Sequence, residues 1–166
     1  MNLEVEIKAP LKDAKRKVEA LGARHVRSVA QTDTYFSHPS RDLAKTDEAF
    51  RIRESDGTFL TYKGPKQSKD LKARMEIEFP VPKDAYMMLS ALGFEKAFTI
   101  KKSRDMYELE GLSICCDIVE GLGEYVEVEG TSIAQHDRIM DVMEMLGAAE
   151  SATTKSYSEL LAASSL

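Results

Sequence analysis

Acidic and basic side chains alternate with apolar ones in several short stretches of this sequence. The motif Glu-x-Glu occurs three times, at Glu4-x-Glu6, Glu76-x-Glu78 and Glu127-x-Glu129. Carboxylate oxygens are the ligands that Mg²⁺ and Mn²⁺ prefer, whereas arginine and lysine bind phosphate oxygens. Acids and bases in this pattern indicate chemistry in which carboxylates hold a divalent metal ion while cationic side chains hold a phosphorylated molecule.

The basic residues follow the same alternation. Pooled from the polar faces of the charged stretches, the candidates are seven acids and seven bases. The acids are Glu4, Glu6, Glu76, Glu78, Asp117, Glu127 and Glu129, and the bases are Lys8, Arg51, Arg53, Lys63, Arg74, Lys102 and Arg104. A polyphosphate bound together with divalent cations would neutralise both sets at once.

Alternation of this kind has the period of a β-strand, whose successive side chains point to opposite faces. In the second predicted strand, Gln31, Asp33 and Tyr35 share one face. Loops are expected at 41–48 and 64–71. The predicted strands or extended segments are residues 2–8, 23–36, 50–53, 59–63, 73–79, 98–109, 112–119 and 124–129.

Helices are predicted between these strands because apolar residues recur there at helical spacing. Pro10 and Pro82 are expected in the first turns of two helices, and Ser132 is expected to cap a third. A last short helix is expected over residues 157–163. Each of the first three helices follows a Glu-x-Glu strand or its turn and ends in a Leu-Gly pair, at Leu21-Gly22, Leu92-Gly93 and Leu146-Gly147.

The helices bear on where the charged faces lie. Helices with apolar stripes must pack on something, and the apolar faces of the strands are available. An open sheet would then leave the charged faces in water, whereas a closed barrel would enclose them in a channel. A surface lattice of salt bridges is the alternative, but exposed pairs contribute only ~0–1 kcal/mol each. Stability alone therefore explains the pattern poorly.

Length and composition narrow the class of protein. With 166 residues, the chain is expected to form one domain, residues 1–166. A net charge of −5 argues against a nucleic-acid partner. No apolar run is long enough for a membrane span and no signal peptide is visible, so we expect no membrane association. Cys115 and Cys116 are adjacent without a CxxC spacing, which is typical of a cytoplasmic protein.

Taken together, the motifs resemble the signature of the CYTH superfamily, also called triphosphate tunnel metalloenzymes. The resemblance covers nearly the whole chain and rests on Glu4-x-Glu6-x-Lys8, Arg51-x-Arg53, Lys63, Arg74-x-Glu76-x-Glu78, Lys102-x-Arg104, Asp117 and Glu127-x-Glu129. Residues 31–36, Gly121-Leu122-Gly123 and Ser156-Tyr157 are similar to the class IV adenylate cyclase branch. The resemblance implies an α+β fold, a closed antiparallel eight-stranded β-barrel forming a tunnel, with helices packed on the outside.

The resemblance also implies a function. It suggests an enzyme that depends on Mg²⁺ or Mn²⁺ and converts ATP to cyclic AMP and pyrophosphate. One alternative is a triphosphatase that hydrolyses inorganic triphosphate, thiamine triphosphate or a nucleoside triphosphate. A second is a sensor that binds a triphosphate without turning it over. The family further suggests a homodimer.

Residue by residue, the match assigns the seven acids to the metal and the seven bases to the phosphates. The candidate catalytic residues among them are Glu4, Glu6, Lys8, Lys102 and Arg104. Three tyrosines, Tyr35, Tyr107 and Tyr157, are predicted to pack near the rim. The lysine-rich loop at 64–72 is either solvated or a lid over the tunnel mouth.

Overall fold

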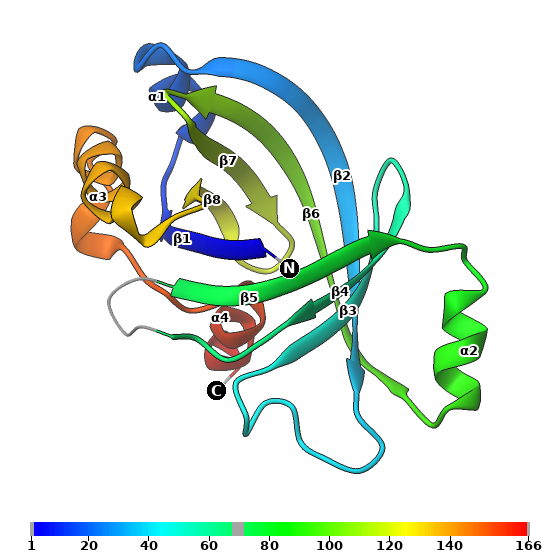
Figure 1. The fold of residues 1–166 in the computed structure, drawn as a ribbon. Coiled ribbons are helices and arrows are strands. Elements are labelled where there is room, and N and C mark those ends of the chain that lie inside the picture. Colours follow the sequence, from blue (N-terminus) through cyan, green and yellow to red (C-terminus); the bar gives the residue numbers. More distant parts are fainter. Residues whose placement is uncertain (1, 68–71, 166) are drawn as a thin grey trace.

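The strands of this computed structural model close into a barrel (Figure 1). The structure describes residues 2–67 and 72–165. Within them the strands are β1 (Asn2–Pro10), β2 (Arg24–Ser37), β3 (Ala49–Glu54), β4 (Thr58–Lys63), β5 (Lys72–Pro80), β6 (Glu95–Leu109), β7 (Leu112–Val119) and β8 (Gly123–Gly130). Their order around the ring is β1-β5-β4-β3-β2-β6-β7-β8, and the paired strands are antiparallel. The predicted fold class is confirmed.

Helices lie outside this ring and at one of its mouths (Figure 1). Their bounds are α1 (Ala14–Ala20), α2 (Ala85–Ala91), α3 (His136–Met145) and α4 (Tyr157–Ser164), with short 3₁₀ turns at Ile133–Gln135 and Ala149–Ser151. The Leu-Gly ends are confirmed, because Gly22, Gly93 and Gly147 all adopt positive φ after the last helical turn. Ser132, predicted to cap the third helix, caps the 3₁₀ turn Ile133–Gln135 that leads into α3, in a reciprocal capping box with Gln135.

The predicted helical positions of the two prolines were wrong. Pro10 is the last residue of β1, paired with Tyr125 of β8, and α1 begins only at Ala14. Pro82 stands three residues before the start of α2 at Ala85. In both cases pairing or turn structure extends past the proline before the helix begins.

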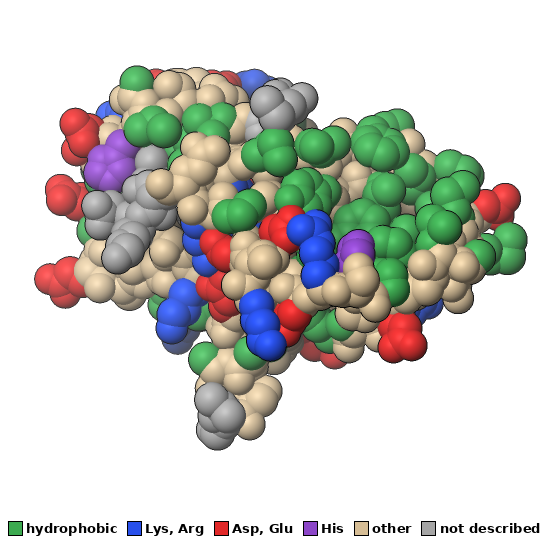
Figure 2. Space-filling model, turned by 60° about the horizontal axis from the view of Figure 1, so that its bottom comes forward, with side chains coloured by type: hydrophobic (Ala, Val, Ile, Leu, Met, Phe, Trp, Pro, Cys, Tyr) green, Lys and Arg blue, Asp and Glu red, His purple; other side chains and the backbone are tan. Residues whose placement is uncertain are grey.

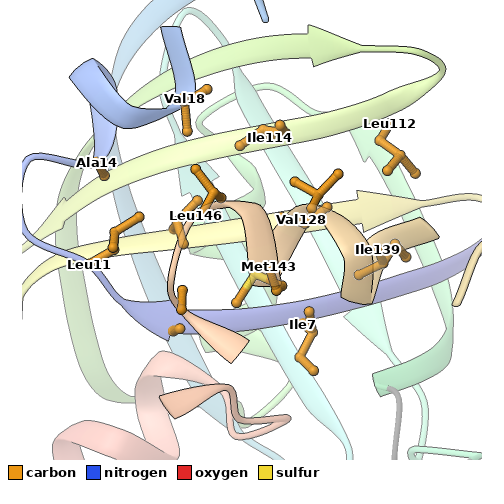
Figure 3. Packing of buried hydrophobic residues seen from close by; sticks show 14 of the residues in the cluster. Ile7, Leu11, Ala14, Val18, Leu112, Ile114, Val128, Ile139, Met143 and Leu146 are labelled. Carbon is orange, nitrogen blue, oxygen red and sulfur yellow. The ribbon is translucent and has the colours of Figure 1, made fainter. Parts of the chain in front are cut away.

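The hydrophobic core lies between the barrel wall and the helices rather than inside the barrel. Figure 3 shows Val18 of α1 and Met143 of α3 packed over Ile7, Ile114 and Val128, which point outward from β1, β7 and β8. A second cluster joins α2 to the outer faces of β2 and β3 through Leu89, Phe36 and Ile52. Because the apolar side chains face outward, the alternating charged side chains must face the lumen.

The strand register places charged residues of neighbouring strands directly beside one another on the lumen side of the barrel wall. Glu6 stands opposite Glu129, Lys8 opposite Glu127, and Arg104 opposite Asp117. Many of these groups are almost fully buried. The alternative of a surface salt-bridge lattice was therefore wrong.

Candidate active site in the barrel lumen

A cavity of about 1110 Å³ runs through the barrel and out beside α4. Of the fourteen charged residues predicted from the sequence, thirteen line it. Asp117 is the exception, and it instead contacts the cavity-lining Arg104. The barrel thus brings the two predicted sets together in one space.

Three of the seven predicted acids converge. Carboxylate oxygens of Glu4, Glu6 and Glu129 lie within 4.8 Å of one another, contributed by β1 and its neighbour β8. These residues form what we call the three-carboxylate cluster. Within the described residues no other group of this kind was found. Three hard oxygen donors at this separation fit a divalent cation such as Mg²⁺ or Mn²⁺.

The pKa values of two carboxyl groups in this cluster also support a site for a divalent cation. Burial raises the pKa of Glu129 to about 7, with the neighbouring carboxylates of Glu127 and Glu6 adding to the effect and Arg104 opposing it. Burial also raises the pKa of Glu4 well above its ordinary value, although Lys63 opposes the shift. The protein's own cations therefore leave these two carboxylates incompletely compensated, as expected of groups that meet a metal ion.

Within the cluster, Glu4 accepts a hydrogen bond from Lys63 at 2.5 Å and Glu6 accepts one from Lys8 at 2.9 Å. The other four predicted acids lie outside the cluster and also pair with protein groups. Glu127 lies 3.2 Å from the ammonium of Lys8 and accepts a 2.5 Å hydrogen bond from Arg104. These cations outweigh burial and hold the pKa of Glu127 well below its ordinary value. Asp117 accepts two hydrogen bonds from Arg104, at 2.8 and 2.6 Å.

Glu76 and Glu78 complete that group. Glu76 lies 2.9 Å from the ammonium of Lys63, and Glu78 accepts a hydrogen bond from Thr61 at the exposed end of β5. Burial opposes ionisation of Glu76, but its hydrogen bond with Glu4 and the charge of Lys63 lower its pKa to about 2. Glu76 is thus an ionised partner of a predicted phosphate ligand.

Basic side chains of β1, β3, β4 and β6 face the three-carboxylate cluster and its surroundings. Lys8 and Lys102 are almost fully buried, and the pKa of Lys102 is lowered to about 8, first by burial and then by Arg104. In contrast, Glu6 and Glu127 outweigh burial and raise the pKa of Lys8. The protein therefore compensates the charge of Lys102 incompletely, and an anionic ligand would favour its charged form.

Arg74 is used differently from the other predicted phosphate ligands. Its Nε donates to the carbonyl of Gly64 at 2.6 Å, and its Nη2 donates to the carbonyl of Asp47 at 2.8 Å. The guanidinium therefore ties together two loops at the tunnel mouth. Arg74 lines the cavity, but most of its hydrogen-bond donors already bind backbone carbonyl oxygens.

Two lumen residues were not among the predicted ligands. Asp33 binds Arg53 at two points and Arg51 at 3.3 Å. The sequence could have indicated this residue, because Asp33 lies on the polar face of β2, the strand that pairs with Arg51-x-Arg53 of β3. Tyr157 reaches in from α4, donates to Asp117 at 2.7 Å and sets its ring 5.0 Å from the Lys8 ammonium.

Three tyrosines were predicted to pack near the rim. Tyr157 packs against Ile100 and Tyr125, but its hydroxyl also donates to Asp117 and its ring lies beside the ammonium of Lys102. Tyr107 bonds Glu19 on the α1 side. Tyr35 stacks on Phe98 with ring centroids 4.7 Å apart. Tyr35 and Tyr157 thus belong to one cluster beside the cavity, whereas Tyr107 lies in the core outside the barrel.

The loop predicted as solvated or as a lid is only partly described. Lys66 lies 2.7 Å from Glu159 of α4 and 3.4 Å from Asp47. Residues 68–71 lie outside the described residues, so the lid stays a prediction. Figure 2 shows acidic and basic side chains side by side in the middle of this face, with hydrophobic side chains gathered toward α2.

A closed antiparallel barrel whose lumen carries a carboxylate cluster beside buried arginines and lysines defines a tunnel protein with a charged, anion-accepting interior. Comparison with known proteins agrees with this class. The CYTH domain family matches residues 2–157, and the chain belongs to that family.

No helix among the described residues is long and apolar enough to cross a membrane.

Three relatives illustrate the similarity. A protein of Methanocaldococcus jannaschii named "Putative adenylate cyclase" is 39% identical, over 95% of this chain and 98% of its own. A solved Pyrococcus horikoshii structure has a TM-score of 0.88 at 36% identity, covering 96% of this chain and 98% of its own. A Hippeastrum structure has a TM-score of 0.74 at 19% identity, covering 98% and 96%. That protein is described as a "putative adenylyl cyclase" with a dominant triphosphatase activity.

Proposed function

We propose that this chain is a divalent-metal-dependent enzyme that acts on a triphosphate in its tunnel, converting ATP to cyclic AMP and pyrophosphate. The observation that carries the proposal is the three-carboxylate cluster set beside six buried or half-buried cationic side chains in one closed lumen. These are Lys8, Arg51, Arg53, Lys63, Lys102 and Arg104. A metal ion alone would not need the cations, and a phosphate alone would not need the acids.

The roles of the side chains follow from their pairing. Glu4, Glu6 and Glu129 would hold Mg²⁺ or Mn²⁺, which when bound withdraws charge from a phosphate oxygen and helps to activate the attacking oxygen. Lys102 and Arg104 would bind phosphate oxygens and neutralise charge on the leaving group. Asp117 keeps both in place, by contacts of 3.5 and 2.6 Å.

In the cyclase reaction the ribose 3′-oxygen forms a bond to the α-phosphorus. The bond from that phosphorus to the bridging oxygen of pyrophosphate breaks, and the hydroxyl proton is released. Little covalent help is needed, because phosphoryl and nucleotidyl transfer depend mainly on positioning and charge neutralisation. The name of the 39% identical relative supports the cyclase as first candidate.

A triphosphatase is the second candidate. The same side chains would serve attack of water on the terminal phosphorus of inorganic triphosphate, thiamine triphosphate or a nucleoside triphosphate. The activity described for the Hippeastrum protein of the same fold is the observation that favours it.

The deciding experiment incubates purified protein and Mn²⁺ with ATP, inorganic triphosphate or thiamine triphosphate and follows products by phosphorus NMR and chromatography. Cyclic AMP with pyrophosphate supports the cyclase, and phosphate released from any of the three substrates supports the triphosphatase. Binding without turnover across metals and pH would replace both with a triphosphate sensor. Glu129→Gln serves as the control, because products that form at the wild-type rate in this variant come from a contaminant or show that Glu129 is not needed for turnover.

A further inference from the structure

Two buried polar atoms in the described part of the chain lack a hydrogen-bond partner. They are the carbonyl oxygen Oε1 of Gln31 and the nitrogen Nε of Arg51. Both residues line the cavity, and both are 7% exposed. Buried polar groups in folded proteins are nearly always paired, so each of these two atoms is open to a partner that enters the cavity, either a water molecule or a ligand atom.

The two atoms have opposite hydrogen-bonding character. Arg51 Nε can only donate, and the rest of this guanidinium is engaged, since Nη1 donates to Asp33 and to Tyr35. Gln31 Oε1 can only accept. A ligand that satisfies both must therefore present at least one acceptor and at least one donor.

An inorganic triphosphate meets only half of this requirement. Fully ionised phosphate oxygens accept hydrogen bonds and carry no proton to give, so they satisfy Arg51 and leave Gln31 unpaired. A hydroxyl or amino group attached to the triphosphate would supply the missing donor. Sites built to bind such a group discriminate strongly against analogues that lack it, because the buried protein atom is then left unpaired.

The two side chains lie along the same lumen face of β2 and β3. The backbone of Arg51 stands opposite Tyr35, four residues beyond Gln31 on β2, and its guanidinium reaches Asp33, two residues from Gln31. Gln31 stands opposite Lys102 of β6. Different parts of one extended ligand can thus meet Arg51 and Gln31.

We propose that Gln31 is a specificity-determining residue of the lumen, whose Oε1 accepts a hydrogen bond from a hydroxyl or amino group on the organic part of a bound triphosphate, while phosphate oxygens accept from Arg51 Nε. Gln31 would then separate organic from inorganic triphosphates. The inference rests on the proposed function and names the residue that selects the substrate.

The test compares Gln31→Met with the wild-type protein. Methionine is unbranched and similar in length, but it lacks the amide oxygen. Calorimetric dissociation constants are measured with Mn²⁺ for ATP and for inorganic triphosphate. We expect Gln31→Met to weaken ATP binding about 5- to 100-fold and to change inorganic triphosphate binding by less than about twofold.

Arg51→Lys is the matched control in the same cavity. It removes the Nε donor, so it should weaken both ligands by a similar factor. Analogues then identify the donor, with 2′-deoxyATP and 3′-deoxyATP testing the sugar hydroxyls and inosine triphosphate testing the base amino group. The analogue that lacks the donor should bind the wild-type protein as weakly as ATP binds Gln31→Met, and should be insensitive to that substitution.

Folding is checked separately. Since Gln31→Met removes an unpaired buried acceptor, the ligand-free variant should unfold at the same temperature as the wild-type protein or higher. Equal weakening of both ligands, or unchanged ATP binding in a folded variant, overturns the role of Gln31 while the triphosphate function stands. Failure of the wild-type protein to bind either triphosphate overturns both.

Discussion

The carboxylate of Asp33 accepts two hydrogen bonds from the guanidinium of Arg53, from Nε at 2.7 Å and from Nη2 at 2.7 Å. Asp33 also lies 3.3 Å from Arg51, and it is 2% exposed. One buried acid therefore holds two of the proposed phosphate ligands in place before any ligand arrives. This pre-organisation reduces the conformational entropy that these side chains lose when a triphosphate binds.

The first prediction concerns the stability that Asp33 contributes. Asp33→Asn leaves two buried guanidinium groups without a counter-charge and should lower the free energy of unfolding by about 3 kcal/mol at neutral pH. Chemical denaturation would measure it. Asp56→Asn is the control, because its pair with Arg27 is half exposed and should contribute less than about 1 kcal/mol.

The pH dependence of that effect has a definite sign. Burial alone would raise the pKa of Asp33, but Arg51 and Arg53 outweigh it and hold the pKa well below its ordinary value of 3.8. The unfolded chain therefore takes up this proton first as the pH falls, and the stabilisation, complete above about pH 4, is lost below it. The difference between wild type and Asp33→Asn should shrink from pH 5 to pH 3. A constant difference would contradict the assignment.

The second prediction divides the seven predicted metal-site acids. Glu129→Gln should reduce Mn²⁺-dependent turnover by at least about 100-fold, because it removes one of three converging carboxylates. The ligand-free variant should remain folded, since the change relieves repulsion from Glu127 and Glu6. Glu78→Gln should retain most activity, because that carboxylate is exposed and bonded to Thr61. Equal loss of activity in both variants would mean that the metal-binding residues extend beyond the three-carboxylate cluster.

Much of this architecture could be predicted because strand periodicity is local. A period of two places Glu4, Glu6 and Lys8 on one face whatever the neighbouring strand is, and helices with apolar stripes then decide which face is covered. The position of Pro10 was mispredicted for the opposite reason. Pairing with β8 extends β1 through Pro10, which overrides its local preference for a helix start.

The grouping of the charges could not be predicted from single stretches. Whether an acid meets a metal or an arginine depends on which strands become neighbours and in what register. Asp33 and Arg53 are twenty residues apart in sequence and are opposed only through the β2–β3 pairing. Tyr157 enters the lumen from a helix, so no strand pattern reports it.

The third prediction concerns Tyr157. Its ring centroid lies 5.0 Å from the ammonium of Lys8 and 4.8 Å from that of Lys102. Tyr157→Leu removes this ring and should weaken inorganic triphosphate binding about tenfold, because both lysines lose a surface that orients them. Tyr157→Phe keeps the ring and should lose only a few-fold. Calorimetry would measure both, with Tyr107→Phe as a control whose hydroxyl bonds Glu19 outside the lumen. Equal losses in the two Tyr157 variants would assign the effect to the hydroxyl instead.

The last prediction uses the charge of Lys102. Because burial and Arg104 lower its pKa to about 8, the ligand-free protein holds this ammonium charged below pH 8 and loses it progressively above. A bound triphosphate favours the charged form, so binding must take up a proton at high pH and weakens there. Affinity for inorganic triphosphate should fall about tenfold between pH 7.5 and pH 9.5, and at any pH it should fall with added salt. Lys102→Arg, which stays charged over this range, should flatten the pH profile while it keeps the salt dependence. If the wild-type and Lys102→Arg profiles coincide, the charge of Lys102 does not contribute to binding the anion.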